Sequence, residues 1–344
     1  MITVQESWER AFEDPFRSHL EGLLPAFLTS SRWFGGKAKT IRSAQFADVV
    51  RVGTENGALV IVFIEVSYAQ ADKETYVVPI TAAFDAEAER IKRDHANAVI
   101  GDVSVAYAQE SQRGVLYDAL WNHECALTLL GNMKRDVRLQ GCSGALVGSA
   151  TGLFDDVTVA LNPSSVSVMK GEQSNTSVKF SDRVMMKLYR RIEPGMNPEL
   201  EIGRALTARS FRNSPELVGA LEYARENGEP ITLALAQRFI ANQGNAWDYT
   251  LSQLSLCFDR IGDLHHTNVA DSAATVQINS SSVSTDLVLG FIDTARLLGR
   301  RTGELHNALG QTSADPAFSP EPCSTSYVLQ RIQAMQRSTI QAMA

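Results

Sequence analysis

The sequence predicts an α+β fold, because two kinds of periodicity occupy two different parts of the chain. β-Branched and apolar runs recur from residue 46 to residue 235, the clearest being LVIVFIEV at 59–66 and VMMKLY at 184–189. From residue 247 onward, apolar residues return at helical spacing, interrupted by a Ser/Thr-rich stretch near 272–285. No repeat with a period of about 20–50 residues is visible, which excludes solenoid and propeller folds. We therefore expect a mixed sheet region followed by helices.

Composition and charge exclude several classes of protein. The 344 residues are 44% hydrophobic and 21% charged, which is typical of ordinary globular domains. The net charge of −7 is spread along the chain and leaves no basic stripe, so we expect no nucleic-acid partner. The sequence starts without a signal-peptide pattern, and its longest apolar run is too short to cross a bilayer, so we expect a cytoplasmic protein with no membrane partner. Four widely spaced cysteines predict neither a zinc site nor disulfides.

Residues 1–92 are predicted to form a small α+β domain. Apolar residues at helical spacing over 4–28 predict a helix that ends at the cluster SRWFGGK, residues 31–37. Strands are expected at 46–52, 59–66 and 75–80, with a turn at 55–57. Arg32, Trp33 and Phe34 could form a sugar-binding platform, but packing in the core beneath the cap is the more common role of such residues.

Residues 93–165 are a connecting region whose fold the sequence leaves open. From Val115 onward, apolar residues at helical spacing predict a helix. The glycines that follow indicate turns and short strands; they are Gly141, Gly144, Gly148 and Gly152.

A short polar loop joins two strand-like runs within residues 166–180, VSVMKGEQSNTSVKF. Small and polar residues let backbone N–H groups and hydroxyls come close to a polyphosphate. The candidate phosphate-contacting residues are Gln173, Ser174, Asn175, Thr176 and Ser177. The alternative is that they form only a polar hairpin tip.

The next strand, residues 184–189, contains one interior cation, Lys187. In protein kinases a strand lysine that follows the phosphate loop pairs with the α and β phosphates, and a glutamate on the next helix holds it. The segment NPELEIGR predicts such a helix, with Asn197 as its N-cap and proline at the first helical position. We expect Glu201 to hold Lys187; Glu199 is the alternative, because both carboxylates lie in the first turn.

A strand at 231–235 leads through QRFI into the polar stretch ANQGNAW, residues 241–247. This arrangement resembles the hinge that links the sheet lobe of a kinase to its helical lobe. Backbone groups of Arg238 and Ile240 would then contact the adenine edge of ATP.

An apolar stripe over 286–309 predicts a long core helix beyond the hinge. The stretch GDLHHTN, residues 262–268, resembles the catalytic loop of a phosphotransferase, with Asp293 as a metal ligand further on. We do not adopt this interpretation, because a catalytic loop should follow the core helix and Asp293 lies within the helical pattern.

Five stretches of the chain resemble the maltokinase family in their usual order: RWFGGK, GEQSNTSVKF, MMKLYRRIEPGMNPELEIGRAL, QRFIANQGNAWDYTL and ARLLGRRTGELHNAL. The resemblance covers nearly the whole chain and implies a protein-kinase-like fold. It also implies an enzyme that uses ATP and Mg²⁺ to convert maltose to maltose 1-phosphate, which feeds α-glucan (glycogen) synthesis. The family also occurs fused to trehalose synthase, which makes that enzyme a candidate partner.

The resemblance implies a definite domain order. It places a cap domain at 1–92, an intermediate region at 93–165, an ATP-binding N-lobe at 166–242 and the start of a helical C-lobe at 243–344. The family's catalytic loop, HGDxH, and its metal-binding Asp-Phe-Glu do not occur before Ala344, so we expect an incomplete C-lobe and a chain that is inactive alone. Two hypotheses stay open: a maltokinase polypeptide or part of one, and a non-catalytic nucleotide- or glucan-binding module that associates with trehalose synthase.

Overall fold

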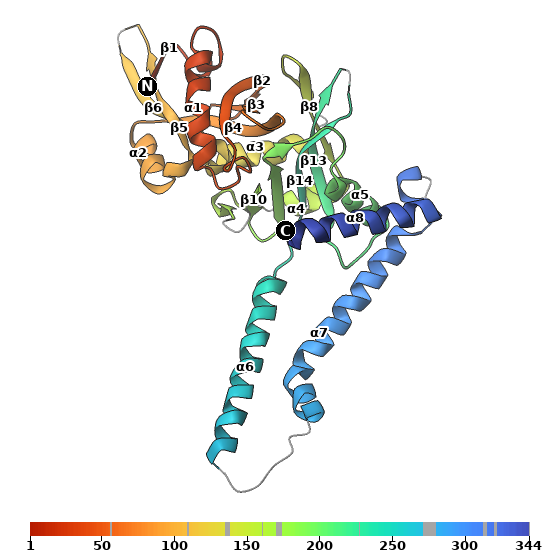
Figure 1. Ribbon diagram of the computed structural model, residues 1–344. Helices are drawn as coiled ribbons and strands as arrows, with labels where there is room; N and C mark the ends of the chain where they lie inside the picture. Colours follow the sequence, from red (N-terminus) through yellow and green to blue (C-terminus); the bar gives the residue numbers. More distant parts are fainter. Residues whose placement is uncertain are drawn as a thin grey trace. The chain divides into compact units, whose positions relative to one another are not determined.

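Two compact units make up the chain in its computed structural model. The described residues are 1–55, 57–108, 110–134, 138–159, 161–169, 174–226, 228–270, 280–311, 315–319 and 322–343. The first unit contains residues 1–208 and 214–242, and the second contains 209–213 and 243–344. Both sheets lie in the first unit and the three longest helices in the second, so the predicted α+β class is confirmed (Figure 1).

The first sheet has the strand order β1-β5-β6-β4-β3-β2, and a short strand, β12, pairs with β4. Its strands are β1 (Ile2–Gln5), β2 (Ile41–Gly53), β3 (Ala58–Tyr68), β4 (Glu74–Phe84), β5 (Val99–Ala106), β6 (Ser111–Asp118) and β12 (Arg191–Ile192). Helix α1 (Arg17–Ser30) packs on β2 and β5 through the buried Leu20, Leu24 and Leu28. Helix α2 (Asp85–Asp94) follows β4 directly. The three strands predicted between residues 46 and 80 are confirmed as the cores of β2, β3 and β4.

The helix predicted over 4–28 is wrong in its first part. Residues Ile2–Gln5 form β1, which pairs in parallel with β5, and Trp8–Phe12 form a short 3-10 helix before α1 begins. Val4 pairs with Val105, and Ile2 and Val4 are both buried against this partner strand. Pairing over such a sequence distance is invisible in local spacing, because the partner strand supplies the hydrogen bonds.

The helix predicted from Val115 is also wrong at its start. Residues Ser111–Asp118 form β6, which lies between β5 and β4, and helix α3 begins only at His123 and ends at Lys134. Val115, Leu116 and Tyr117 are all buried. A strand that is covered on both faces shows a continuous apolar run, and such a run cannot be told from a buried helix by periodicity.

The second sheet has the order β7-β8-β13-β14-β11-β10-β9. Its strands are β7 (Arg138–Gln140), β8 (Gly144–Ala150), β9 (Val166–Val168), β10 (Asn175–Phe180), β11 (Val184–Tyr189), β13 (Leu217–Arg225) and β14 (Ile231–Arg238), and α4 (Phe154–Thr158) follows β8. Helix α3 covers one face and helix α5 (Pro198–Ala208) the other. The neighbouring residues Gly148 and Ser149 of β8 show this: a Cβ at Gly148 would collide with Asn132 of α3, whereas the Ser149 hydroxyl accepts from Arg204 of α5 at 3.2 Å.

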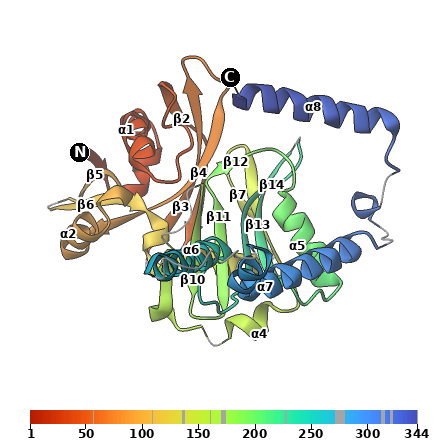
Figure 2. The ribbon, with the colours of Figure 1, turned by 60° about the horizontal axis from the view of Figure 1, so that its bottom comes forward.

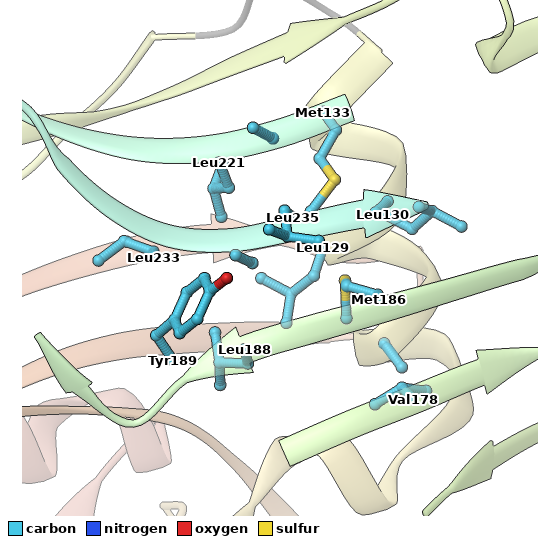
Figure 3. Packing of buried hydrophobic residues seen from close by; sticks show 14 of the residues in the cluster. Leu129, Leu130, Met133, Val178, Met186, Leu188, Tyr189, Leu221, Leu233 and Leu235 are labelled. Atoms are coloured by element: carbon cyan, nitrogen blue, oxygen red, sulfur yellow. The ribbon is translucent and has the colours of Figure 1, made fainter. Parts of the chain in front are cut away.

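A single buried cluster joins the two sheets. Leu129, Leu130 and Met133 of α3 face the side chains of the second sheet (Figure 3). Phe63 of the first sheet belongs to the same cluster, and its ring lies 4.2 Å from that of Tyr223 on β13. The link also continues in the backbone, because β12 follows β11 almost directly and pairs with β4 (Figure 2).

Three long helices form most of the second unit: α6 (Ala246–Ala270), α7 (Ser280–Leu309) and α8 (Thr325–Met343). Tyr249 of α6 stacks on Phe291 of α7, with 6.5 Å between the ring centroids. The helix predicted over 286–309 is confirmed as part of α7, which also contains Asp293, but Leu298 of its apolar stripe is 65% exposed and lies in no core. Residues 262–268 lie within α6, in agreement with the decision not to treat them as a catalytic loop. Within the described part of the chain, none of the helices combines the length and apolar character that a membrane crossing needs.

Candidate nucleotide-binding site

Lys187 lies in the middle of β11, between β10 and β14. It pairs in register with Ser177 on one side and Leu235 on the other. Its ammonium group donates to a carboxylate oxygen of Glu199, with 2.8 Å between Nζ and Oε2. The Tyr189 hydroxyl donates to the same oxygen at 2.7 Å. Lys187 and Tyr189 share a face of the sheet, because they are two residues apart on one strand.

The preference for Glu201 as the partner of Lys187 is wrong, and the alternative, Glu199, is the residue that makes the contact. Helix α5 begins at Pro198, and the Glu199 amide donates to the Asn197 side chain at 2.8 Å, which confirms the predicted N-cap. Residues two apart on a helix point to different sides, since each residue turns the helix by about 100°. With Glu199 directed at β11, Glu201 is therefore directed away from it.

The candidate phosphate-contacting residues separate into three groups. Gln173 lies outside the described residues, and Ser174 is exposed at the start of the described part. Asn175 pairs in register with Tyr189 and Ser177 with Lys187, so both side chains lie on the face that carries the lysine. Thr176 lies on the opposite face, where its hydroxyl accepts from the Nε of Arg190 at 2.8 Å.

The predicted hinge residues lie at and just beyond the end of β14. The Arg238 amide donates to the carbonyl of Glu216 at 2.9 Å, and its side chain pairs with the Glu216 carboxylate at 2.6 Å. Ile240 is 51% exposed, and its carbonyl accepts from the Asn242 side chain at 3.1 Å. The next amide along, that of Phe239, donates to Arg183 and so holds the strand end against the turn before β11.

Two contributions to this site were missed by sequence reasoning. Tyr189 shares the Glu199 oxygen with Lys187, and the alternation of side chains along β11 could have indicated it. Arg190, which holds Thr176, also pairs with Asp118 at 2.5 Å, and no local signal connects those two residues because they are 72 positions apart. Burial lowers the pKa of the Arg190 guanidinium, and the Asp118 charge and hydrogen bond oppose this effect.

The side chains around Lys187 can hold an anion, but the described residues include no cluster of metal ligands. Lys187 is half-buried and is oriented by Glu199, as a lysine that grips phosphate oxygens must be. Among the described residues, no three His, Cys, Asp or Glu side chains lie close enough to hold a metal ion.

The first part of the chain is similar to a known protein family. Residues 27–121 match the family model of the maltokinase N-terminal cap domain. They begin within α1 and run to Trp121, and so include β2 to β6. The match therefore extends past residue 92, the boundary expected from the sequence.

Solved structures of glucosamine kinases are similar to a larger part of the chain. Crystal form A is 17% identical, with a TM-score of 0.46 over 87% of this chain and 52% of that chain. The complex with glucosamine, ADP and inorganic phosphate is 16% identical, with a TM-score of 0.43 over 84% of this chain and 51% of that one. Crystal form B is 16% identical, with a TM-score of 0.47 over 90% and 54%, respectively. The chain thus spans about half the length of these kinases.

Proposed function

We propose that this chain carries the ATP-binding part of a cytoplasmic sugar kinase that phosphorylates maltose to maltose 1-phosphate for α-glucan synthesis. The match of residues 27–121 to a maltokinase cap domain supports the proposal. The observation that carries it is the ion pair between Lys187 on β11 and Glu199 on α5. A strand lysine held by a glutamate of the next helix is the arrangement that protein kinases use to grip the α and β phosphates of ATP.

The residues present fit the triphosphate of ATP. Lys187 supplies a compact positive charge, and Ser177 and Asn175 place a hydroxyl and an amide on the same face of the sheet. Glu199 and Tyr189 limit the directions in which the lysine can point, which reduces the entropy lost when it meets a phosphate.

We assign no residue to Mg²⁺, although kinases of this kind use it. The described residues offer no cluster of three His, Cys, Asp or Glu side chains that could hold a metal ion. We also assign no catalytic base, since the printed sequence contains no HGDxH motif. The role of the described residues is therefore to bind and orient the nucleotide.

A second candidate function requires nucleotide binding at Lys187 but no catalysis. In this alternative the chain is a non-catalytic module that binds nucleotide or glucan and associates with trehalose synthase. The oriented Lys187 favours nucleotide as its ligand.

The test is a calorimetric titration of the whole chain with ATP, in wild type and in single variants. Lys187→Met keeps most of the side-chain volume and removes a charge-assisted contact of about 1.5–3 kcal/mol, so ATP affinity should fall about ten- to a hundredfold. Glu199→Gln should weaken binding less, and the double variant should lose less than the two single losses added. Glu201→Gln should leave ATP affinity unchanged.

Lys73→Met is the matched control. Lys73 pairs with Glu65 at 2.7 Å on the surface of the first sheet, so its loss removes a similar ion pair away from the site. Thermal melts verify that each variant is folded. If wild type binds ATP and Lys187→Met binds it equally well, both candidate functions lose their nucleotide site.

Turnover separates the two candidates. Formation of maltose 1-phosphate from ATP and maltose by the pure chain would support the kinase. Binding of ATP that depends on Lys187, with no turnover of maltose, would support the binding module instead.

A further inference from the structure

A cavity of about 410 Å³ lies within the first compact unit, on the side of the second sheet that faces away from Lys187. Its lining comes from segments that are far apart in the sequence: 31–33, 93–98, Asp118, Trp121, 168–169, 175–176 and Arg190. Thr176 pairs in register with Leu188, one residue from Lys187 on β11, so its side chain projects from the other face of the sheet. The cavity therefore lies on the other face of the sheet from Lys187, and Asn175, at the start of β10, borders both the cavity and the candidate nucleotide site.

Arg190 is the buried centre of the cavity lining. It is 1% exposed, and it donates through Nε to Thr176 and through Nη2 to Asp118. Its third nitrogen, Nη1, is buried and has no hydrogen-bond partner among the described residues. Buried donors are almost always satisfied in folded proteins, so an unpaired guanidinium nitrogen beside a cavity indicates a missing acceptor.

The charges around the cavity favour an anion as that acceptor. Arg32, Arg93 and Arg190 line it, against Asp94 and Asp118. Both carboxylates are already engaged, Asp118 by Arg190 and Asp94 by Arg93 at 2.8 Å. Arg32 is exposed and has no ion-pair partner in the described part of the chain. The lining is thus net positive on a chain whose overall charge is −7.

The size and the other side chains indicate more than a bare ion. A volume of about 410 Å³ lies in the range of pockets that hold small organic ligands. Asn97 adds an amide group that can hydrogen-bond to hydroxyls. Trp121 adds apolar surface and is itself held in place by stacking on His95, at 4.1 Å between centroids.

We propose that this cavity binds a small phosphate monoester of a sugar, with the phosphate held by arginines and the sugar by the Asn97 amide and the Trp121 indole. Guanidinium groups bind phosphate oxygens through two parallel hydrogen bonds, which suits the arginine-rich lining. This site goes beyond the proposed kinase function and does not depend on it.

The experiment titrates the full chain with three probes: glucose 1-phosphate, inorganic phosphate and glucose. Calorimetry gives the affinity, and tryptophan fluorescence reports on Trp33 and Trp121, which both line the cavity. We expect glucose 1-phosphate to bind more tightly than inorganic phosphate, and glucose not to bind. Binding of inorganic phosphate without the ester, or of glucose as tightly as the ester, would refute the proposal.

Two variants locate the site. Arg32→Gln should weaken the binding of glucose 1-phosphate about tenfold, because it removes one charge-assisted contact from an exposed residue whose loss should not affect folding. Arg42→Gln is the matched control, since Arg42 is an exposed arginine on β2 that does not line the cavity, and it should leave affinity unchanged. Equal affinity in Arg32→Gln and wild type would overturn the proposal.

A third variant separates the cavity from the nucleotide site. Lys187→Met should bind glucose 1-phosphate as wild type does, whatever it does to ATP. If Lys187→Met no longer binds glucose 1-phosphate, the ester binds at the nucleotide site and the proposal of a second site is wrong.

Discussion

Removal of the Asp118 carboxylate should destabilise the first compact unit more than any surface change. The side chains of Asp118 and Arg190 are 3% and 1% exposed, and Nη2 of the arginine lies 2.5 Å from the carboxylate. In Asp118→Ala the guanidinium stays buried and loses its counter-charge, because the backbone around it is held by β12 and the first sheet. Breaking a buried pair in this way costs about 3–5 kcal/mol of unfolding free energy.

The assay is urea unfolding followed by circular dichroism, with a thermal melt in parallel. For a unit of this size, a loss of about 3–5 kcal/mol corresponds to a fall in Tm of about 6–20 °C. Asp118 also accepts from the Leu120 amide at 3.2 Å, so Asp118→Asn serves as a closer variant that keeps an acceptor and removes the charge. Glu87→Ala breaks the exposed pair with Arg90 and should change stability by less than about 1 kcal/mol.

A double variant identifies the cause of the loss. Asp118→Leu with Arg190→Leu removes both charges, and it should be more stable than Asp118→Ala alone, since an apolar pair no longer leaves a charge unpaired. The reasoning is refuted if Asp118→Ala stays within about 1 kcal/mol of wild type, because the guanidinium would then not need this carboxylate.

Two further predictions concern pH and thiol reactivity. Burial by itself raises the pKa of Glu74, but hydrogen bonds from Lys39 and two tyrosines outweigh it and lower the pKa from 4.5 to about 2. The ionised Glu74 therefore stabilises the fold above about pH 4.5, and this stabilisation is lost as the pH falls toward 2. When unfolding free energy is measured from pH 4.5 down to pH 2, it should fall less in Glu74→Gln than in wild type. Burial raises the pKa of the Cys125 thiol to about 11, so a thiol reagent at pH 8 should label the exposed Cys142 and Cys323 first and Cys125 only on unfolding. Rapid labelling of Cys125 in the native chain would contradict its burial.

Local chemistry was enough to predict the strand that carries Lys187 and the start of the helix that follows. The apolar alternation around Lys187 and the Asn197-Pro198 pair are signals that each depend on a few neighbouring residues. The choice between Glu199 and Glu201 was different. Both satisfy the same local pattern, and only the rotation of α5 about its axis, set by its packing on β13, decides which carboxylate reaches the lysine.

The predictions for residues 2–5 and 111–118 failed for a related reason. Strands β1 and β6 are defined by hydrogen bonds to partner strands elsewhere in the chain. Because β6 is covered on both faces, its apolar residues do not alternate with polar ones, and the sequence alone does not distinguish it from a helix. Thr176 shows the same limit within the candidate site. Its residue type suits a phosphate loop, but the strand register places its hydroxyl on Arg190.

The sequence by itself determined the α+β class, the order of sheet and helix regions, the lysine strand and the N-cap of the helix after it. These features follow from propensity and spacing, which act between residues close together in the chain. Only the tertiary structure decided the partner of Lys187, the buried pair of Arg190 with Asp118 and the cavity beside it. Each of these depends on which residues from distant segments come within hydrogen-bond distance, and that distance is set by the packing of two sheets and three helices around one buried cluster.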